Sequence, residues 1–532
     1  MIIQKTEKGI VLTWAIVSAV IFLILVGGLL SFVLMEQKYS TENAAYEEAL
    51  HIAEGGVNYY KWLLNKHATT TQEDVQNGNT WCTSSDTIAK CGSLDWCGPY
   101  IYDYKDTNGS VVGRHELCTK PKKICDQILA VQLKSTGYKI NTPNVKRSLL
   151  IKFAATTIAD YAYMIEDNVW AGADREIHGK YHANGGVKMD GSGNSLVTSG
   201  SDTWLCGSSY GCNYNNCPSG CARVATATAC RCPGVFGDGL PNDLWKSGVT
   251  RFNFAGITSG LQKIKDLANA KGRYYGPSTT TDSSADGYHI VFNSDGTFDV
   301  RIVTEIDNIY STYNDGATNT PGWYPEKIRT EYNYKTNVTT TDDCGLIFLE
   351  DNVWVEGTVK GRKTLASANL IDSSVDTSAI LNWNIDYTAL DGSDSFALIA
   401  EKDVSVPLCS PGGNSDNNNF CKRSGNTGSQ MTVRGVYVAQ KGRFGRNYYP
   451  SSVTQGRKTT SYSPWYLRNT MMIYGTIVSS KRVGTKWTCG WGYCSGYADR
   501  FDYFDQRLSK DPPPMLPYVS PDLQIVSWEE LQ

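Results

Sequence analysis

Hydrophobic and polar residues divide the chain into one long apolar run and a much larger region of mixed polarity. Residues 10–35 carry no charged side chain. As a helix this run would be about 39 Å long, which exceeds the ~30 Å hydrocarbon thickness of a bilayer. Beyond it, apolar residues recur every three or four positions, at Ala45, Ala49, Ile52, Ala53, Val57, Tyr60 and Leu64. The spacing predicts one helix over residues 10–65, apolar on all sides at first and then amphipathic.

The region after this helix consists of short runs that are typical of strands. Within residues 66–154 these runs are broken by polar turns and cysteines, which together with the helix predicts a small α/β body. From residue 155 onward, strand candidates are separated by single Gly or Asn residues, as at 354–359, 364–368, 397–400, 435–439 and 472–478. Short runs with small turns favour a parallel β-helix, and a β-sandwich is the alternative. The predicted fold class is therefore α+β, with a large all-β region over residues 155–532.

Two local patterns interrupt the short strands. Residues 289–292 and 297–303 flank a turn that contains Asp295 and Gly296, and this pair supplies the positive φ of a hairpin turn. Residues 251–271 show a weak helical spacing of apolar positions, which indicates an insertion or a cap.

An internal repeat marks the β-rich region. The sequence Glu-Asp-Asn-Val-Trp occurs at residues 166–170 and again at residues 350–354. A hydrophobic strand candidate precedes each copy, and a glycine next to a basic residue follows each one. A feature that occurs twice at equivalent places is more typical of a turn or a layer of the fold than of a single active site.

Composition supports an exported, β-rich protein. Charged residues make up 19% of the chain, below the roughly 25% of average globular proteins, and tyrosine is abundant at 32 residues. Aromatic residues favour strands, whereas Gly and Asn favour turns. The net charge of −3 gives no indication of nucleic-acid binding.

The 16 cysteines are even in number and follow an export helix, so we interpret them as disulfides. The spacing favours two local bridges, Cys409–Cys421 and Cys489–Cys494. Six more cysteines lie in an insertion near residues 200–235. Zinc is the alternative for these six, but they form no paired Cys-x-x-Cys motifs and no histidine lies among them.

Catalytic motifs are lacking in the sequence. There is no His-Glu-x-x-His motif, and no Gly-x-Ser-x-Gly in a strand–helix setting. His178 and His182 are four residues apart, but the glycines around them favour a strand and a turn over a helix. We therefore predict no enzymatic activity and no cofactor. Calcium is considered for three oxygen-rich loops, at residues 106–109, 190–194 and 414–419.

A short charged segment ends just before the apolar run. Its end, Lys8-Gly9, followed by the apolar residues from Ile10, resembles the site where prepilin peptidase cuts type IV prepilins. The resemblance implies a leader over residues 1–9, with Gly9 as its last residue and Ile10 as the first mature one. In major pilins the fifth mature residue is Glu, which pairs with the amine of a neighbouring subunit. Here it is Trp14. The K-type pseudopilin, which caps a filament tip, also lacks this Glu.

Two further stretches carry resemblances. Residues 49–57 look like the Ala-Leu-x-x-Ala-Glu-x-Gly-Val segment of PilX-like minor pilins, and we expect Gly55 and Gly56 to pack closely in a filament, like Trp14. Residues 66–154 would then be a Cys-rich, pilin-like body. Residues 182–186, 354–362 and 503–508 resemble an uncharacterised family of bacterial surface proteins, which have β-solenoid-like ectodomains.

These resemblances imply a minor, tip-type subunit of a type IV pilus or a type II secretion-like filament. Its partners would be the membrane, prepilin peptidase, other pilins through the helix, and a glycan or another surface ligand. Lys5 and Lys8 precede the apolar run, which favours an N-terminus inside the cell and an ectodomain outside. The alternatives are a membrane-anchored β-helix enzyme acting on polysaccharide and a surface scaffold outside any filament. A cleaved secretory signal would have a shorter apolar core.

Overall fold

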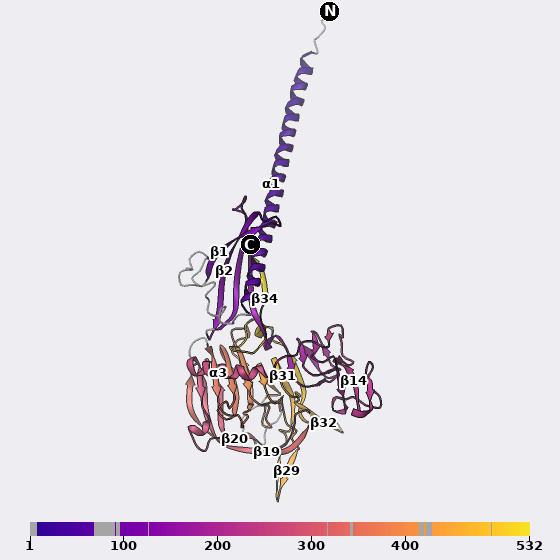
Figure 1. Ribbon diagram of the computed structural model, residues 1–532, viewed down its shortest axis with the longest axis vertical. Coiled ribbons are helices and arrows are strands. Elements are labelled where there is room, and N and C mark those ends of the chain that lie inside the picture. The colour runs from indigo at the N-terminus through magenta and orange to yellow at the C-terminus, as the bar shows by residue number, and fades with distance from the viewer. Residues whose placement is uncertain are drawn as a thin grey trace, which may run out of the picture. The chain divides into compact units, whose positions relative to one another are not determined.

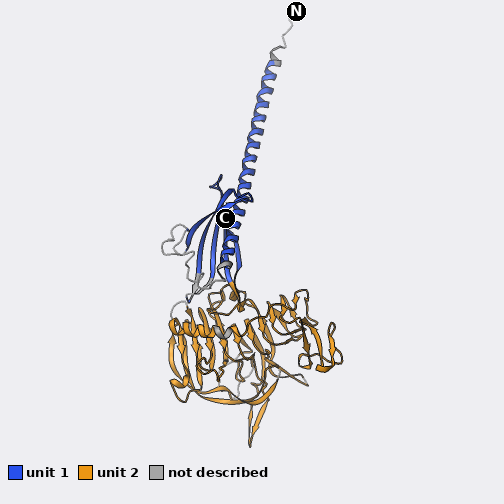
Figure 2. Cartoon of the chain, viewed as in Figure 1, with its two compact units in different colours: residues 1–154, 522–532 blue, residues 155–521 orange. Residues whose placement is uncertain are grey.

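The computed structural model describes residues 8–68, 91, 96–125, 127–316, 318–340, 344–413, 420–421, 428–490 and 492–531. The chain forms two compact units (Figure 2). Unit 1 comprises residues 1–154 and 522–532, and unit 2 comprises residues 155–521.

Unit 1 combines one long helix with one sheet (Figure 1). The helix α1 spans Lys8–Ala68, close to the predicted residues 10–65. The sheet has the order β1-β2-β3-β4-β34, and β1 to β4 pair antiparallel in sequence. Its strands are β1 (Cys97–Lys105), β2 (Val111–Ile124), β3 (Gln127–Lys139), β4 (Lys146–Thr157) and β34 (Tyr518–Leu531).

The last strand differs from the sequence-based division of the chain. Residues 155–532 were expected to form one β-rich region, but β34 lies beside β4 in the sheet of unit 1. Its side chains also connect to this unit, since Arg147 forms an ion pair with Glu530. A short apolar run predicts a strand, but it does not identify a pairing partner so far away in the sequence.

The amphipathic half of α1 packs on the sheet of unit 1. Its apolar face, which includes Ala53, Val57 and Tyr60, is buried against side chains of β2, β3 and β4. The hydroxyl of Ser135 on β3 donates a hydrogen bond of 2.7 Å to the carbonyl of Ala53. This face is the one that the three-to-four spacing predicts.

Unit 2 is built on strands that pair parallel with one another. In the longest ladder each strand pairs parallel with the next one in the series. In spatial order its strands are β17 (Arg273–Tyr275), β21 (Leu346–Leu349), β23 (Arg362–Ser367), β25 (Ser395–Ala400), β27 (Gln430–Ala439), β31 (Leu467–Ser479), β5 (Tyr163–Ile165), β8 (Tyr181–Ala183), β11 (Val197–Ser199) and β16 (Trp245–Lys246).

Further parallel ladders run beside this one. The first contains β18 (Gly287–Phe292), β22 (Val353–Val359), β24 (Ala379–Tyr387), β26 (Val404–Ser405) and β28 (Phe444–Gly445). In the second, β31 continues to β33 (Gly492–Tyr503), β7 (Glu176–His178) and β10 (Ser192–Gly193). The third contains β6 (Val169–Ala171), β9 (Val187–Met189) and β15 (Val235–Phe236).

Buried apolar side chains hold the ladders in register. Along the longest ladder, partners in successive strands are apolar and buried, and they include Ile347, Leu365, Leu398, Tyr437, Ile477, Tyr163, Tyr181 and Val197. A shift of one residue would turn such a side chain to the opposite face of its strand, so burial fixes the register.

The spatial order of the strands in unit 2 is not their order in the sequence. The chain enters at β5, within the longest ladder, and moves outward through β8 and β11 to β16. It then passes through helix α3 (Gly256–Lys271) to β17, at the other end of the ladder. From there it returns strand by strand to β31, which pairs with β5. The entry and exit of unit 2 are therefore adjacent, and the Ile158 amide donates to the Pro517 carbonyl over 3.1 Å.

The predicted hairpin is present and belongs to a longer one. β18 pairs antiparallel with β19 (Phe298–Asn314), and the Gly296 amide closes the turn by donating to the Asn293 carbonyl. β19 then pairs along its whole length with β20 (Asn319–Val338), an extension that the sequence did not indicate. This hairpin buries Trp354 with Val303 and Ile380.

Smaller elements complete unit 2. They are β12 (Thr203–Cys206), β13 (Ala222–Val224), β14 (Ala229–Pro233), β29 (Ser452–Gln455), β30 (Lys458–Ser461), β32 (Lys486–Cys489), α4 (Gln506–Lys510) and the single 3-10 turns η1 (Ile158–Asp160), η2 (Ser208–Tyr210), η3 (Ala225–Ala227) and η4 (Ser278–Thr280). Its disulfides include Cys409–Cys421 and Cys489–Cys494, the two pairs that the spacing suggested. In unit 1, Cys91 is bonded to Cys118.

Candidate functional site

The largest exposed apolar surface of unit 1 is the first half of α1. Large side chains from Leu12 to Met35 are mostly between a half and three quarters exposed, for example Leu23 at 68% and Phe32 at 64%. This stretch is long enough and apolar enough to cross a membrane, and it is not buried by the rest of the described chain. Exposed apolar surface of this extent marks a membrane or an association surface.

The residues named for processing and tip identity lie at the start of this surface. Gly9 and Ile10 fall within the helical backbone of α1. Trp14 is 70% exposed, so its indole ring is free to meet lipid or another protein.

The structure gives Gly55 and Gly56 a different role from the expected one. A side-chain carbon at Gly55 would lie 2.6 Å from the ring of Tyr104. At Gly56 it would collide with the hydroxyl of Ser135 and lie 2.9 Å from Leu117. Both glycines thus let α1 approach the sheet of its own subunit. This corrects the expectation that they pack in a filament. The sequence around a glycine indicates close packing, but it does not tell which segment the glycine packs against.

The two copies of the repeat form the same corner between two ladders. In each copy the Asp carboxylate accepts a hydrogen bond of 2.7 Å from the Asn amide that follows it. The side chain of Asn168 accepts from the Gly186 amide at 2.7 Å, and that of Asn352 accepts from the Ser378 amide at 2.9 Å. Each Asn therefore joins its corner to the corner of the next layer.

The acidic residues in the second copy of the repeat, Glu350 and Asp351, form an ion pair and hydrogen bonds within the chain. Glu350 is buried, lies 2.5 Å from Lys265 and accepts from the Leu370 amide at 2.7 Å. Asp351 accepts from the amide and the hydroxyl of Ser278. These contacts position the chain and leave little of either carboxylate open to a substrate.

The two tryptophans of the repeat have different surroundings. Trp354 is buried, and its indole nitrogen donates to the Glu326 carbonyl at 2.7 Å. Trp170 is 36% exposed, and its indole nitrogen donates to Asp190 at 2.7 Å. The hairpin of β19 and β20 covers the second copy of the motif, while the first copy faces a cavity that the sequence did not reveal.

His178 and His182 lie on the separate strands β7 and β8, as their glycine-rich surroundings indicated. His182 is buried between Thr198 and Asn184, each 2.9 Å from one ring nitrogen. Burial lowers the pKa of His182, which favours its neutral form. His178 stacks on Tyr503. Neither contact set resembles a shared metal site.

Two of the three loops considered for calcium lie within the described residues, and the acidic side chain that begins each loop already has partners. Asp106 accepts from the amides of Asn108 and Ser110, both at 2.9 Å. Asp190 accepts from Trp170 and lies 2.9 Å from Lys188, so its charge is already neutralised. The third loop, residues 414–419, lies outside the described residues. Among the described residues there is no group of three or more His, Cys, Asp or Glu side chains that could hold a metal.

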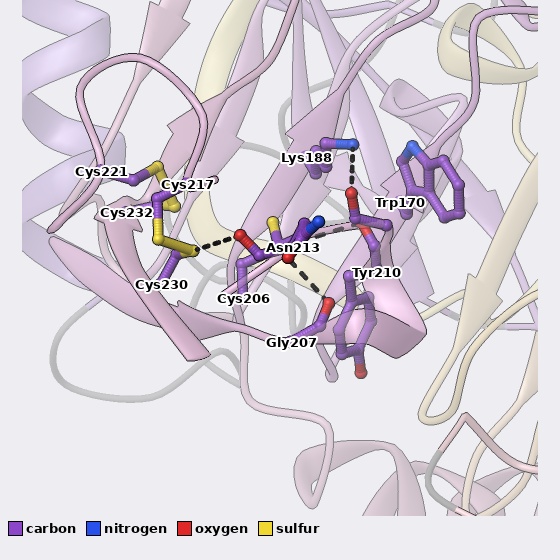
Figure 3. Close-up of a disulfide and its surroundings, with 12 residues drawn as sticks. Trp170, Lys188, Cys206, Gly207, Tyr210, Asn213, Cys217, Cys221, Cys230 and Cys232 are labelled. Carbon is purple, nitrogen blue, oxygen red and sulfur yellow. Dashed lines mark hydrogen bonds between the residues drawn. A yellow bond between two sulfur atoms is a disulfide. The ribbon is translucent and has the colours of Figure 1, made fainter. Parts of the chain in front are cut away.

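The Cys-rich insertion forms a small disulfide-linked module of β12, β13 and β14. Its three bridges are Cys206–Cys212, Cys217–Cys230 and Cys221–Cys232, and the last two lie side by side (Figure 3). The loop closed by Cys206–Cys212 touches the rest of unit 2, because Lys188 donates to the Gly211 carbonyl and Gly211 abuts the ring of Trp170. The module therefore packs against Trp170 and Lys188 of the third ladder.

Comparisons with known proteins give little guidance. Neither a known protein family nor a curated protein matches the sequence. Among solved structures, the chain is similar to the competence-associated pilin ComZ from Thermus thermophilus, with 10% identity over 92% of this chain and 98% of that chain. The TM-score is 0.27. A likeness at this level supports no conclusion about fold or function.

Proposed function

We infer that this chain is a minor subunit of a type IV pilus or a type II secretion-like filament, and that it sits at the filament tip. The observation that carries the proposal is the architecture of α1. Its apolar first half is exposed, while its second half is fixed to a sheet of the same subunit. Such a helix can first anchor the subunit in a bilayer and later pack among the helices of a filament.

The leader and Trp14 support this role. The junction of Gly9 and Ile10 follows a lysine and precedes the apolar run, as at a prepilin processing site. A tryptophan as the fifth mature residue cannot pair with the amine of a subunit above it. A subunit that lacks this contact is suited to the end of a filament, where no such neighbour is present.

Unit 2 would be the module that the filament displays. Its parallel ladders support a parallel β-helix, which is a rigid platform for a ligand site. In this proposal the N-terminus lies in the cytoplasm and the apolar half of α1 crosses the membrane. The sheet of unit 1 and all of unit 2 lie beyond it in an oxidising compartment, where the disulfides are stable. Recognition of a surface ligand, without catalysis and without a cofactor, would be the role of unit 2.

The mature N-terminus tests the proposal. The full chain is produced in cells with an active prepilin peptidase, and the N-terminal peptide is identified by mass spectrometry. We expect Ile10 as the first residue. Gly9→Leu should block processing, whereas the matched control Gly28→Leu, at a glycine with no neighbouring atoms within 4 Å, should be processed normally. An intact Met1 in the wild-type protein would overturn the proposal.

Location distinguishes the tip from the shaft. Sheared surface filaments should contain the processed chain in far smaller amounts than the major subunit, and immunogold labelling should mark filament ends. Uniform labelling along the filament would exclude the tip role. Absence from filaments would favour a surface scaffold.

A further inference from the structure

Unit 2 contains a cavity of about 520 Å³, which falls within the range of small-molecule sites. Most of its walls come from three stretches that are distant in sequence: β6 with the turn after it at residues 169–175, residues 482–488, and residues 500–502 of β33. Single residues from other strands and loops, among them Arg443, complete the lining. Trp170, from the first copy of the repeat, is part of the lining. The cavity therefore forms only when β5 to β7 stack on β31 and β33, which the chain reaches near the end of unit 2.

Positive charge dominates the lining. Five cationic side chains face two carboxylates, Asp174 and Asp502, which leaves an excess of three positive charges; the cations are Arg175, Arg443, Arg482, Lys486 and Arg500. Arg500 pairs with Asp502 at 3.1 Å, and Lys486 pairs with Asp174 at 3.1 Å. These two ion pairs occupy both carboxylates of the lining.

Within the part of the chain that the structure describes, the remaining arginines have a distant carboxylate partner or none. Arg175 is 3.9 Å from Asp174, and its pKa is lowered, first by the positive charge of Arg500 and then by burial. Arg482 donates to the Ser209 carbonyl at 3.0 Å and lies over the ring of Tyr210. A bound anion would relieve the repulsion among these like charges.

Arg443 is a buried arginine in the wall of the cavity. Its side chain is almost fully buried, with 3% of the residue exposed. One terminal nitrogen contacts Asn447, but Nε has no hydrogen-bond partner among the described residues. Nε is itself buried, so Arg443 contributes positive charge to the wall of the cavity and not a hydrogen bond to a ligand.

Aromatic rings complete the lining. The indole nitrogens of Trp170 and Trp487 are already satisfied, by Asp190 and by the Arg446 carbonyl. Both side chains line the cavity, so they contribute mainly carbon surface to it. A ligand that fits must therefore combine negative charge with an apolar face.

We propose that this cavity binds an acidic sugar, meaning a saccharide ring that carries a carboxylate. Arginine forms planar, paired hydrogen bonds with carboxylates, and aromatic rings pack on the C–H face of a sugar ring. Inorganic phosphate would use the charges but not the tryptophans. The inference supplies a ligand for the display role proposed above, and it can be tested on isolated protein whether or not a filament forms.

Binding to the full chain in detergent micelles tests this inference. Calorimetric titration would use oligomers of galacturonate, glucuronate and mannuronate, N-acetylneuraminate, the neutral galactose and glucose oligomers, and inorganic phosphate. We expect saturable binding of at least one acidic sugar, at least tenfold tighter than that of its neutral counterpart and of phosphate. Binding should weaken as salt is raised. Failure of every acidic sugar to bind, or equal binding of phosphate, would overturn the proposal.

Matched variants locate the site. Arg482→Gln and Lys486→Gln should each weaken binding at least tenfold, and Trp170→Ala should weaken sugar binding. Lys486 has a quarter of its side chain exposed, so its replacement should leave the fold intact even if Arg482→Gln loosens the Cys-rich module. The control Arg457→Gln removes an exposed arginine outside the lining and should bind normally. Unchanged binding in folded Lys486→Gln and Trp170→Ala proteins would place the ligand elsewhere.

Discussion

Close approach of the helix to the sheet in unit 1 depends on single glycines. A side-chain carbon at Gly137 on β3 would collide with the backbone of α1, at the Ala49 carbonyl and the Ala53 amide. Gly55 and Gly56 provide the same space from the helix side. The sequence showed that these helix glycines need an explanation, but only the fold shows that their neighbours belong to the same subunit.

Gly137→Ala should therefore loosen the contact between α1 and the sheet. Because backbone atoms cannot move aside as flexible side chains do, we expect a destabilisation of about 1–3 kcal/mol. Hydrogen exchange of the amides over residues 45–64 measures it, and exchange there should speed up. The control Gly260→Ala lies in α3, where no atom is within 4 Å, and should leave this region unchanged. Equal protection in Gly137→Ala would contradict the packing described here.

Glu326 on β20 is a fully buried acid. Burial raises its pKa to about 7, although the Leu408 amide, the Tyr449 hydroxyl and the charge of Arg446 each lower it. The unfolded chain has the ordinary pKa of 4.5 and loses this proton first as pH rises. The folded protein then binds more protons than the unfolded one, so the free energy of unfolding falls between pH 4.5 and pH 7.

Glu326→Gln should remove this pH dependence. The difference between the two pKa values of Glu326 corresponds to about 3 kcal/mol of unfolding free energy. This stability is present below pH 4.5 and is lost by pH 7. Denaturant unfolding at pH 5 and pH 8 measures the difference, which should shrink in the variant relative to the wild type. Glu305→Gln on β19 changes a half-exposed acid and should retain the wild-type dependence. If Glu326→Gln also retains it, Glu326 is ionised throughout this range.

At the scale of elements, the repeat shows what a local pattern can predict. Its two copies indicated a turn or a layer, and both copies make the same Asn-mediated corner. The different fates of Trp170 and Trp354 were not predictable, because they depend on the hairpin that covers only the second copy. The start of β19 was foreseen from the turn at Asp295 and Gly296 that joins it to β18, but β20, whose residues are mostly exposed, was not.

Asn168→Ala should destabilise unit 2 by about 1–3 kcal/mol, because the buried Gly186 amide would lose its acceptor. Urea unfolding followed by tryptophan fluorescence measures the change. Asn168→Asp keeps an oxygen at the same position and should recover part of the loss. Asn242→Ala replaces an exposed Asn and should lie within about 0.5 kcal/mol of the wild type. A similar small effect of Asn168→Ala would mean that the corner is held by its backbone alone.

At the scale of the whole molecule, the sequence predicted the parts better than their connections. The apolar run, the amphipathic face and the short strands follow from local spacing. The return of β34 to the first sheet and the pairing of β5 with β31 join residues that are distant in sequence, so no local pattern reports them. The acidic-sugar cavity was missed for the same reason, since its arginines come together only through this stacking.

The apolar run of α1 gives the last prediction. Each arginine near the middle of a membrane span costs about 2.5–3.5 kcal/mol of insertion free energy. The double variant Leu23→Arg and Leu30→Arg should therefore shift the chain from the membrane pellet to the carbonate-soluble fraction. Both side chains are exposed, so unit 1 should fold as before, as its disulfide Cys91–Cys118 would report on a non-reducing gel.

A control with the same added charge keeps this test specific. Gln37→Arg together with Tyr39→Arg places two arginines in exposed positions of α1 just beyond the apolar run. This variant should remain in the membrane pellet, because arginines at the edge of a span reach the polar interface. If the Leu23 and Leu30 variant also stays in the pellet, the exposed run is not what holds the chain there. The anchoring step of the proposed filament subunit would then have to be abandoned.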